Sequence, residues 1–289
     1  MIPGASGTAS PLRWRCRDRV FALADRARIL GIVNVTPDSF ADGGRSFEPA
    51  AAIQHALRLL EEGADLIDLG AESTRPGATP VPAVEQIRRL GPVLEGLRGR
   101  GAAISVDTTR AEVARHALGL GACAINDVSA LGDPEMAGVV AGAGAGIVLM
   151  HMRGTPATMQ QDPRYDDVAR EVAEWLGERV ETAIGAGIPA ECIVVDPGIG
   201  FGKTARHNLE LLARVGELAT LGRPVLVGAS RKRFLAGPAA DPPEARLEAS
   251  LAVAAVTVFL GAQLVRVHDV AATRRAIEVA RELRAARRS

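Results

Sequence analysis

Residues 28–34 read RILGIVN, an apolar run that ends in a polar amide at Asn34. Seven further runs have the same form, each ending in a polar or ionisable residue. They are Leu66–Ala71 before Glu72, Ala103–Val106 before Asp107, Cys123–Ile125 before Asn126, Ile147–Met150 before His151, Cys192–Val195 before Asp196, Val225–Ala229 before Ser230 and Leu264–Val267 before His268. Continuous Val, Ile and Leu runs are typical of strands buried on both faces, as in a parallel sheet covered by helices.

The segments between these runs have helical character. Ala50–Gly63 carries Ile53, Leu57 and Leu60 at helical spacing and stops at a glycine, which favours a helix C-terminus. The other expected helices are Val84–Leu97, Arg110–Leu120, Pro134–Ala141, Tyr165–Ala186, His207–Ala219, Glu244–Gly261 and Ala272–Arg287. Eight alternations of strand and helix predict an α/β fold, a TIM (β/α)8 barrel in a single domain over residues 28–289. In such barrels the polar residues at the carboxyl ends of the strands meet at one mouth, where the active site forms.

Residues 1–27 form an N-terminal extension in this prediction. Residues 1–10 are small and polar and are expected to be disordered, whereas residues 12–26 are expected to form a hairpin or cap over the bottom of the barrel. The 34 basic and 34 acidic side chains balance, so no overall field favours nucleic acid or an anionic membrane. The absence of an 18-residue apolar stretch argues against a membrane span.

The cysteines and two short motifs exclude further classes. Cys16, Cys123 and Cys192 show no C-x-x-C spacing, which predicts buried, reduced thiols in a cytoplasmic protein rather than disulfides or structural zinc. Gly202-Lys203-Thr204 lacks the glycine that a phosphate-binding P-loop needs five residues earlier, where Pro197 stands. Ser230 does not lie in a G-x-S-x-G elbow, so a serine hydrolase has no support.

Eight motifs, each at the expected end of its own strand, point to one family. They are NVTPDSFADGG at 34–44, ESTRPGA at 72–78, SVDT at 105–108, IND at 125–127, LMHM at 149–152, DPGIGFGK at 196–203, SRK at 230–232 and RVHD at 266–269. From about Arg28 to the C-terminus they resemble, in order, the motifs of the dihydropteroate synthase family. The resemblance implies a transferase of folate synthesis. It would join 6-hydroxymethyl-7,8-dihydropterin diphosphate to p-aminobenzoate and release pyrophosphate and 7,8-dihydropteroate.

The resemblance also implies a pterin site. A dihydropterin presents N–H donors flanked by acceptors, and buried carboxylates and amides can pair with that edge. Asp196 would accept from the pterin N3–H and 2-amino group, Asn126 and Asp107 would hold the opposite side of the ring, and Lys232 would donate to the carbonyl and N5. Met150 and Gly228 complete the implied pterin pocket.

A diphosphate leaving group needs donors and usually a divalent cation. Arg266 and His268 are two residues apart, so their side chains point to the same face of the last strand. In the family these two positions and Arg75 grip the pyrophosphate, while Asn34 binds Mg²⁺ through its side-chain carbonyl, a ligand that suits a hard cation.

The first two loops and the outer rim complete the implied site. Asp38 and Ser39 resemble family residues that close over the reacting centre. The implied aminobenzoate pocket contains Phe40, Thr74, Pro76 and Phe201. The chain departs from the family at Arg233, where a serine helps to bind the aminobenzoate carboxylate; a backbone N–H of that loop or Arg233 itself could supply the contact.

The implied reaction is dissociative. The dihydropterin ring stabilises a cation at its exocyclic methylene as pyrophosphate leaves, and the aniline nitrogen then attacks without a strong base. Catalysis therefore depends on orientation and electrostatics. Asp107 is our first choice for stabilising the cation, and the implied catalytic set further contains Lys232, Asp38, Arg266 and His268.

Several alternatives stay open at this point. Asp107 and Asp196 could cap helices, Asn126 could be a structural amide of the barrel rim, and Lys232 could be a solvated loop lysine. His268 could be a core histidine, and Arg75 could form a surface salt bridge.

The protein as a whole also has alternatives, namely a pterin-binding barrel that transfers a methyl group to a corrinoid, or a non-catalytic paralogue that only binds pterin. The resemblance further implies sulfonamides as competing analogues of p-aminobenzoate. It implies a homodimer formed through the last helices, where Leu251–Leu260 is apolar on more than one face.

Overall fold

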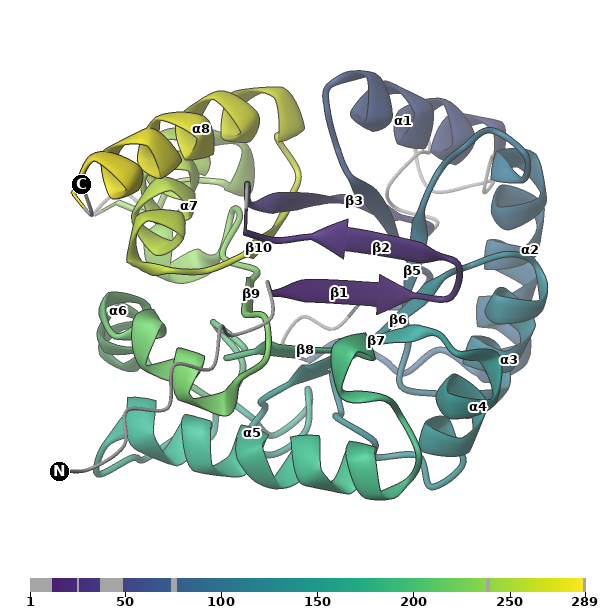
Figure 1. Ribbon diagram of the computed structural model, residues 1–289, viewed down its shortest axis with the longest axis horizontal. Helices are drawn as coiled ribbons and strands as arrows, with labels where there is room; N and C mark the ends of the chain where they lie inside the picture. The colour runs from purple at the N-terminus through teal and green to yellow at the C-terminus, as the bar shows by residue number, and fades with distance from the viewer. Residues whose placement is uncertain (1–11, 25, 37–48, 74–76, 238–239, 288–289) are drawn as a thin grey trace, which may run out of the picture.

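The computed structural model describes residues 12–24, 26–36, 49–73, 77–237 and 240–287. Eight parallel strands form one sheet in the order β8-β7-β6-β5-β4-β3-β10-β9, with helices around it (Figure 1). The strands are β3 (Arg28–Asn34), β4 (Leu66–Gly70), β5 (Ile104–Asp107), β6 (Ala124–Asp127), β7 (Gly146–Met150), β8 (Ile193–Asp196), β9 (Leu226–Val227) and β10 (Leu264–Val267). A parallel bridge between Val195 and Val225 joins the two edges and closes the barrel. The predicted TIM barrel is confirmed.

One α-helix follows each barrel strand. The helices are α1 (Pro49–Glu61), α2 (Ala83–Leu97), α3 (Ala111–Gly119), α4 (Met136–Ala143), α5 (Val168–Gly185), α6 (Ala205–Ala213), α7 (Leu247–Leu260) and α8 (Val270–Ala286). In α1 the fully buried residues are Ala52, Ala56 and Leu59, at spacings of three and four, because one face of the helix packs on the sheet.

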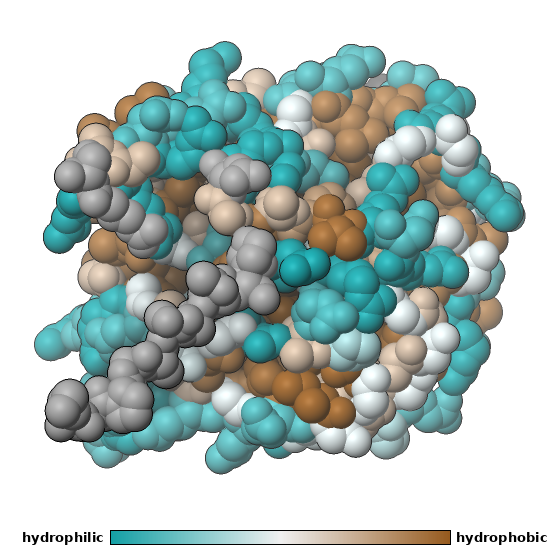
Figure 2. Space-filling view, in the orientation of Figure 1, coloured by the Kyte–Doolittle hydropathy of each residue, from teal (hydrophilic) through white to brown (hydrophobic). Residues whose placement is uncertain are grey.

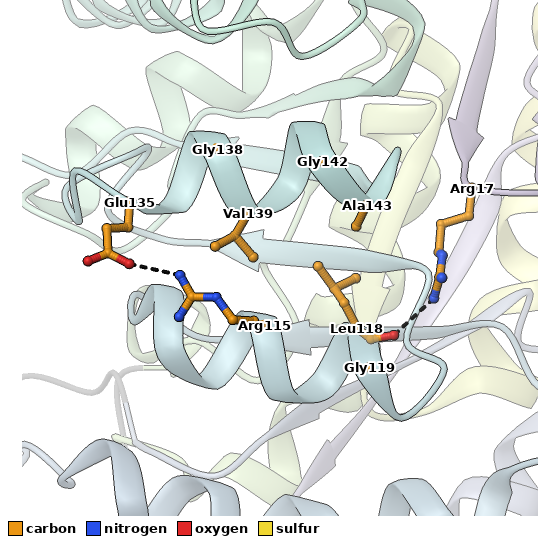
Figure 3. Close-up of a pocket in the computed structure, with 9 residues that line it drawn as sticks. All are labelled: Arg17, Arg115, Leu118, Gly119, Glu135, Gly138, Val139, Gly142 and Ala143. Carbon is orange, nitrogen blue, oxygen red and sulfur yellow. Dashed lines mark hydrogen bonds and ion pairs between the residues drawn. The ribbon is translucent and has the colours of Figure 1, made fainter.

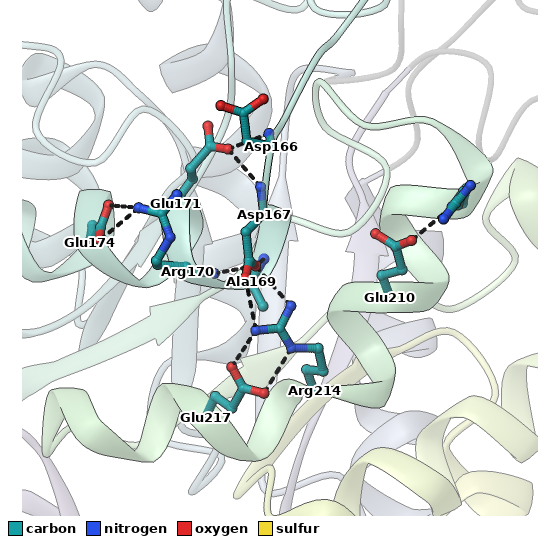
Figure 4. Close-up of polar contacts among 10 residues, drawn as sticks. Asp166, Asp167, Ala169, Arg170, Glu171, Glu174, Glu210, Arg214 and Glu217 are labelled. Atoms are coloured by element: carbon teal, nitrogen blue, oxygen red, sulfur yellow. Dashed lines mark hydrogen bonds and ion pairs between the residues drawn. The ribbon is translucent and has the colours of Figure 1, made fainter.

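Two predicted elements differ in the structure. The single helix expected over His207–Ala219 is an α-helix that ends at Ala213, followed by the 3-10 helix η3 (Val215–Leu221). Between them Arg214 donates to Asp167, which caps α5, and to Glu217 (Figure 4). The strand expected over Val225–Ala229 is paired as a strand only at Leu226–Val227, because the barrel closes there through a single bridge.

The barrel interior changes from apolar to polar along the strands. Successive strand residues point to opposite faces, so alternate positions fill the interior. The lower interior layer is entirely apolar and buried and contains Leu30, Leu66, Ala124, Val148, Val194, Leu226 and Leu264. Two residues further along the same strands, the interior positions include Asp68, Asn126, Asp196 and Arg266. The alternation therefore places a polar layer directly above an apolar floor.

An antiparallel hairpin of β1 (Arg13–Cys16) and β2 (Arg19–Ala22) covers the amino-terminal end of the barrel (Figure 1). Trp14 is fully buried with the lower interior layer, and its Nε1 donates to the carbonyl of Cys192 at 2.9 Å. The hairpin approaches so closely that a Cβ on Gly146 would lie 2.5 Å from the sulfur of Cys16. Figure 2 shows hydrophilic residues around the centre of this outer face. The three cysteines are buried and unpaired, as expected.

We expect Trp14→Ala to lower the free energy of unfolding by about 3–5 kcal/mol, because it empties the bottom of the barrel core. Val20→Ala is the matched control on the same hairpin, since Val20 is 57% exposed, and it should change stability by less than about 0.5 kcal/mol. Urea unfolding of the full chain measures both variants. A similar small loss for both would mean that the hairpin does not stabilise the barrel.

Candidate active site

The candidate site lies where the polar interior layer meets the carboxyl ends of the strands. Asp107, Asn126 and Asp196 end or nearly end β5, β6 and β8, and all three side chains are buried. Arg266, half-buried, enters the same layer from β10. These four residues were expected at the site from the sequence, and the barrel brings them together from separate strands.

Arg266 is shared between two carboxylates. Its Nε donates to Asp68 Oδ2 at 2.6 Å, and its Nη2 donates to Asp107 Oδ2 at 2.9 Å. Asp68 is fully buried on β4, and its Oδ2 also accepts from Asn126 Nδ2 at 3.1 Å. Buried charges are tolerated when they are paired in this way, because the charged hydrogen bonds offset part of the lost hydration.

Burial raises the pKa of Asp107 to about 7, although the neighbouring guanidinium of Arg266 works in the opposite direction. The negative charge of Asp68 adds to the rise. Burial opposes the charged form of Arg266, but Asp68 and Asp107 together raise its pKa above the usual value. The guanidinium therefore stays charged, whereas Asp107 titrates close to neutral pH.

One carboxylate oxygen of Asp196 accepts a backbone hydrogen bond, and the other faces the interior of the barrel. Its Oδ1 accepts from the Gly198 amide at 2.7 Å, and a Cβ placed on Gly228 would lie 3.8 Å from its Oδ2. A side chain at position 228 would therefore lie in van der Waals contact with both Asp196 and Arg266. Burial raises the pKa of Asp196, and the Gly198 amide opposes that rise.

Lys232 is half-buried over the loop that follows β8. Its Nζ donates to the carbonyl of Ile199 at 2.8 Å and lies 4.0 Å from the ring centroid of Phe201. Burial lowers the pKa of Lys232 to about 8, while Asp196 works against the decrease. The side chain of Lys232 is therefore a hydrogen-bond donor held in position beside the site by these contacts, and not a solvated loop lysine.

Neither of the two candidate carboxylates caps a helix. The amide of Ala111, at the start of α3, is satisfied by Asp133 and not by Asp107. Thr204 caps α6 with a side-chain bond to the amide of His207, which leaves Asp196 free of that role. The capping alternative for Asp107 and Asp196 was wrong, because each carboxylate lies at an interior position of the barrel.

The loop after β8 is held by a buried lysine. Lys203 Nζ contacts His151 Nδ1 at 2.9 Å and donates to the carbonyls of Gly198 and Phe201 at 3.0 and 3.1 Å. Burial lowers the pKa of both Lys203 and His151. Gly198 has a φ of +67°, and a Cβ there would lie 1.8 Å from the His151 carbonyl, so only glycine fits.

The upper rim carries the remaining described candidates. Ser230 Oγ and His268 Nδ1 lie 3.1 Å apart, and His268 is half-buried. Asn34 ends β3, and its Oδ1 and Asp107 Oδ2 are each 4.0 Å from a Cβ placed on Gly70. Met150 is buried at the end of β7, whereas Arg233 is exposed at the start of the short helix η4 (Arg233–Leu235).

Six predicted site residues lie outside the described residues. They are Asp38, Ser39, Phe40, Thr74, Arg75 and Pro76. Their roles stay predictions that follow from the family resemblance.

Sequence reasoning missed two residues of this region, Asp68 and Lys203. Asp68 is the one charged residue inside the apolar run Leu66–Ala71, two positions after Leu66, and this parity could have placed it in the barrel interior. The sequence pattern gave no such indication for Lys203, because only the folded conformation of its loop brings its three hydrogen-bond partners to it.

One surface hollow lies away from this mouth. A groove of about 630 Å³ runs between α3 and α4, bordered by Arg17 of the hairpin, and is therefore on the outside of the barrel (Figure 3).

None of the described helices is long and apolar enough to cross a membrane. Among the described residues, no group of three or more His, Cys, Asp or Glu side chains is arranged to hold a metal ion.

We expect Lys203→Met to lower the free energy of unfolding by about 1–3 kcal/mol, because His151 and two buried carbonyls lose their partner. Arg206→Ala is the control two residues after the loop. Arg206 is exposed and forms an ion pair with Glu210 on the surface of α6, so its loss should change stability much less than the loss of Lys203. Urea unfolding compares the two variants, and equal stability of Lys203→Met and the unsubstituted protein would contradict the clamp.

Comparison with known proteins gives a consistent answer. The family model described as pterin binding enzyme matches residues 30–268. The dihydropteroate synthase of Mycobacterium leprae is 45% identical over 260 residues, which cover 87% of this chain and 92% of that protein. The Xanthomonas albilineans dihydropteroate synthase structure with 4-aminobenzoic acid is 47% identical, with a TM-score of 0.88 over 96% of this chain and 99% of that one. A Yersinia pestis dihydropteroate synthase structure with a sulfonamide drug complex is 40% identical, with a TM-score of 0.89 over 94% and 99% of the two chains. The chain belongs to the dihydropteroate synthase family of pterin-binding enzymes.

Proposed function

We propose that the protein is a transferase that condenses 6-hydroxymethyl-7,8-dihydropterin diphosphate with p-aminobenzoate, giving 7,8-dihydropteroate and pyrophosphate. One observation carries the proposal. The barrel mouth combines buried acceptors (Asp107, Asn126 and Asp196) with the cationic donors Lys232 and Arg266, each from its own strand or strand-end loop. This pattern complements a flat, donor-rich heterocycle that carries an anionic tail.

The pterin edge would be read by fixed acceptors. Asn126 Nδ2 is already bonded to Asp68, so the amide presents Oδ1 to a ligand as an acceptor. Asp196 offers its Oδ2 beside the space left by Gly228. Lys232 would exchange its bond to the Ile199 carbonyl for one to the pterin carbonyl.

The diphosphate would be held by Arg266 and His268. Two of the five guanidinium N–H groups of Arg266 bond to Asp68 and Asp107, which leaves three that can donate to phosphate oxygens. His268 follows β10 directly, and its Nδ1 lies 3.1 Å from Ser230 Oγ, so the imidazole would add a donor beside Arg266 at the mouth. Arg75 would add a further donor from the loop after β4.

The chemical step would be dissociative. The bond between the exocyclic methylene and the diphosphate oxygen breaks, and pyrophosphate leaves with the electron pair. The aniline nitrogen of p-aminobenzoate then forms the new C–N bond and loses one proton to solvent. Ionised Asp107 would stabilise the cation at the methylene, which is electrostatic catalysis without a covalent enzyme intermediate.

Mg²⁺ fits the donor set at the end of β3. The Asn34 amide oxygen is a hard ligand, and a Cβ on Gly70 would fill the space beside it and Asp107. Mg²⁺ commonly takes only one or two protein ligands together with phosphate oxygens and waters. Held by Asn34, the ion would neutralise the charge of the leaving diphosphate.

We further propose a cytoplasmic homodimer that sulfonamides inhibit in competition with p-aminobenzoate. The dimer would use α7 and α8, because α7 is apolar on more than one face and Val256, Val279 and Leu283 are largely exposed. The relatives solved with 4-aminobenzoic acid and with a sulfonamide drug support the choice of ligands. Arg233 would bind the carboxylate of p-aminobenzoate.

A pyrophosphate-release assay with the dihydropterin diphosphate, p-aminobenzoate and Mg²⁺ tests the reaction directly, and turnover is the expected result. Asp196→Ala should weaken pterin binding by about 1–3 kcal/mol or more, because two pterin N–H groups lose a charged acceptor. Circular dichroism should show an unchanged fold. No turnover by the unsubstituted protein would contradict the reaction, and normal pterin binding by Asp196→Ala would contradict the pocket.

The pH dependence of kcat/KM should be bell-shaped. The rate should rise through about pH 7 as Asp107 loses its proton, and fall through about pH 8 as Lys232 loses its own. Asp107→Asn should remove the acid limb. Lys232→Arg should move the alkaline limb upward, because a guanidinium keeps its charge. A profile that is flat between pH 6 and 9 would rule out these assignments.

A further inference from the structure

Asp68 lies directly below the candidate site and has no assigned role. It is fully buried in the middle of β4, at an interior position between Leu66 and Gly70. Its Oδ2 accepts hydrogen bonds from Arg266 Nε and from Asn126 Nδ2, whereas its Oδ1 has no hydrogen-bond partner among the described residues. A buried carboxylate lowers the stability of the fold unless ion pairs and hydrogen bonds replace its lost hydration. The presence of Asp68 in an otherwise apolar strand therefore suggests a functional role.

The charge balance of the cluster indicates that role. Asp68, Arg266 and Asp107 together carry one net negative charge when all three are ionised. Without Asp68, the guanidinium of Arg266 would form a neutral ion pair with Asp107. That pair would have little net electric field to stabilise a cation at the pterin methylene. With Asp68, Arg266 is divided between two carboxylates at 2.6 and 2.9 Å.

We propose that Asp68 is a positioning residue that holds Arg266 between itself and Asp107 and thereby keeps one net negative charge on these three residues for the dissociative step. The inference rests on the proposed function. It assigns a role to a residue that would touch neither the pterin nor the diphosphate, since Asp68 lies two residues before Gly70, the register partner of Asp107, and is therefore deeper in the barrel.

A neutral replacement separates this role from simple structural support. Asp68→Asn keeps the shape and one acceptor oxygen but removes the charge. The rate of the chemical step, measured in a single turnover, should fall about tenfold or more, because the cation loses electrostatic stabilisation. The dissociation constant of pyrophosphate should stay the same or decrease, since a negative charge near an anion site has gone. A merely structural loss of Arg266 placement would instead raise that constant.

The pH profile gives an independent readout. The charged groups that act on Asp107 are Arg266, which favours its ionised form, and Asp68, Asp127 and Glu72, which oppose it. Removing the charge of Asp68 should therefore move the acid limb of kcat/KM to lower pH. In an Asp107→Asn background, Asp68→Asn should slow the step further, because the net charge of the three positions then changes from zero to plus one beside the developing cation.

Ser105→Ala is the matched control. Ser105 is the register partner of Asp68 on β5, is fully buried, and has an Oγ without a partner among the described residues. This variant should keep the single-turnover rate and the acid limb of the unsubstituted protein. If Asp68→Asn does not fold, Asp68→Ser carries the same expectations with a smaller neutral side chain.

The outcomes separate the two proposals. No turnover by the unsubstituted protein would overturn the proposed function and this role with it. Normal turnover together with an unchanged rate in the Asp68 variant would overturn the role of Asp68 alone. Weaker pyrophosphate binding in step with the slower rate, or an equal loss in Ser105→Ala, would also overturn it.

Discussion

The guanidinium of Arg266 is the interaction on which the polar half of the barrel depends. The interior of a closed barrel has little room for water, so each charge there must find a partner within the protein. Arg266 donates hydrogen bonds to two carboxylates, Asp68 on β4 and Asp107 on β5. It does so from β10, which β3 separates from β4 in the sheet. The same arrangement orients the amide of Asn126 through their common partner Asp68. A ligand thus meets a set of groups whose directions are already determined.

The rest of the fold keeps this layer in place from below and from the side. The hairpin seals the bottom of the barrel with Trp14, which lets the lower layer remain apolar. Lys203 ties the loop after β8 to His151, so that Asp196, Phe201 and the carbonyl that receives Lys232 keep their positions. Preorganised groups of this kind need no reorganisation when charge develops, and this is the main source of electrostatic catalysis.

Much of the fold could be predicted because its signals are local. The apolar runs that end in Asn34, Asp107, Asn126 and Asp196 show that the strands are buried and where they stop. The failures came where tertiary contacts overrode a local pattern. The helix expected over His207–Ala219 breaks at Arg214, because that side chain bonds to the cap of α5 and to η3. The capping roles considered for Asp107 and Asp196 depended on sequence proximity to a helix, whereas barrel closure turns both side chains inward.

The sequence by itself determined the barrel, the polar mouth at the carboxyl ends of its strands and the family, since strand-end motifs and hydrophobic periodicity do not require knowledge of distant partners. It could not determine which charges pair, because Asp68, Asp107 and Arg266 are separated by up to 198 residues along the chain. Only the tertiary structure places these three side chains within hydrogen-bonding distance. It also decides that Asp107 titrates near neutral pH, since burial and neighbouring charges set that pKa and neither is a local property of the chain.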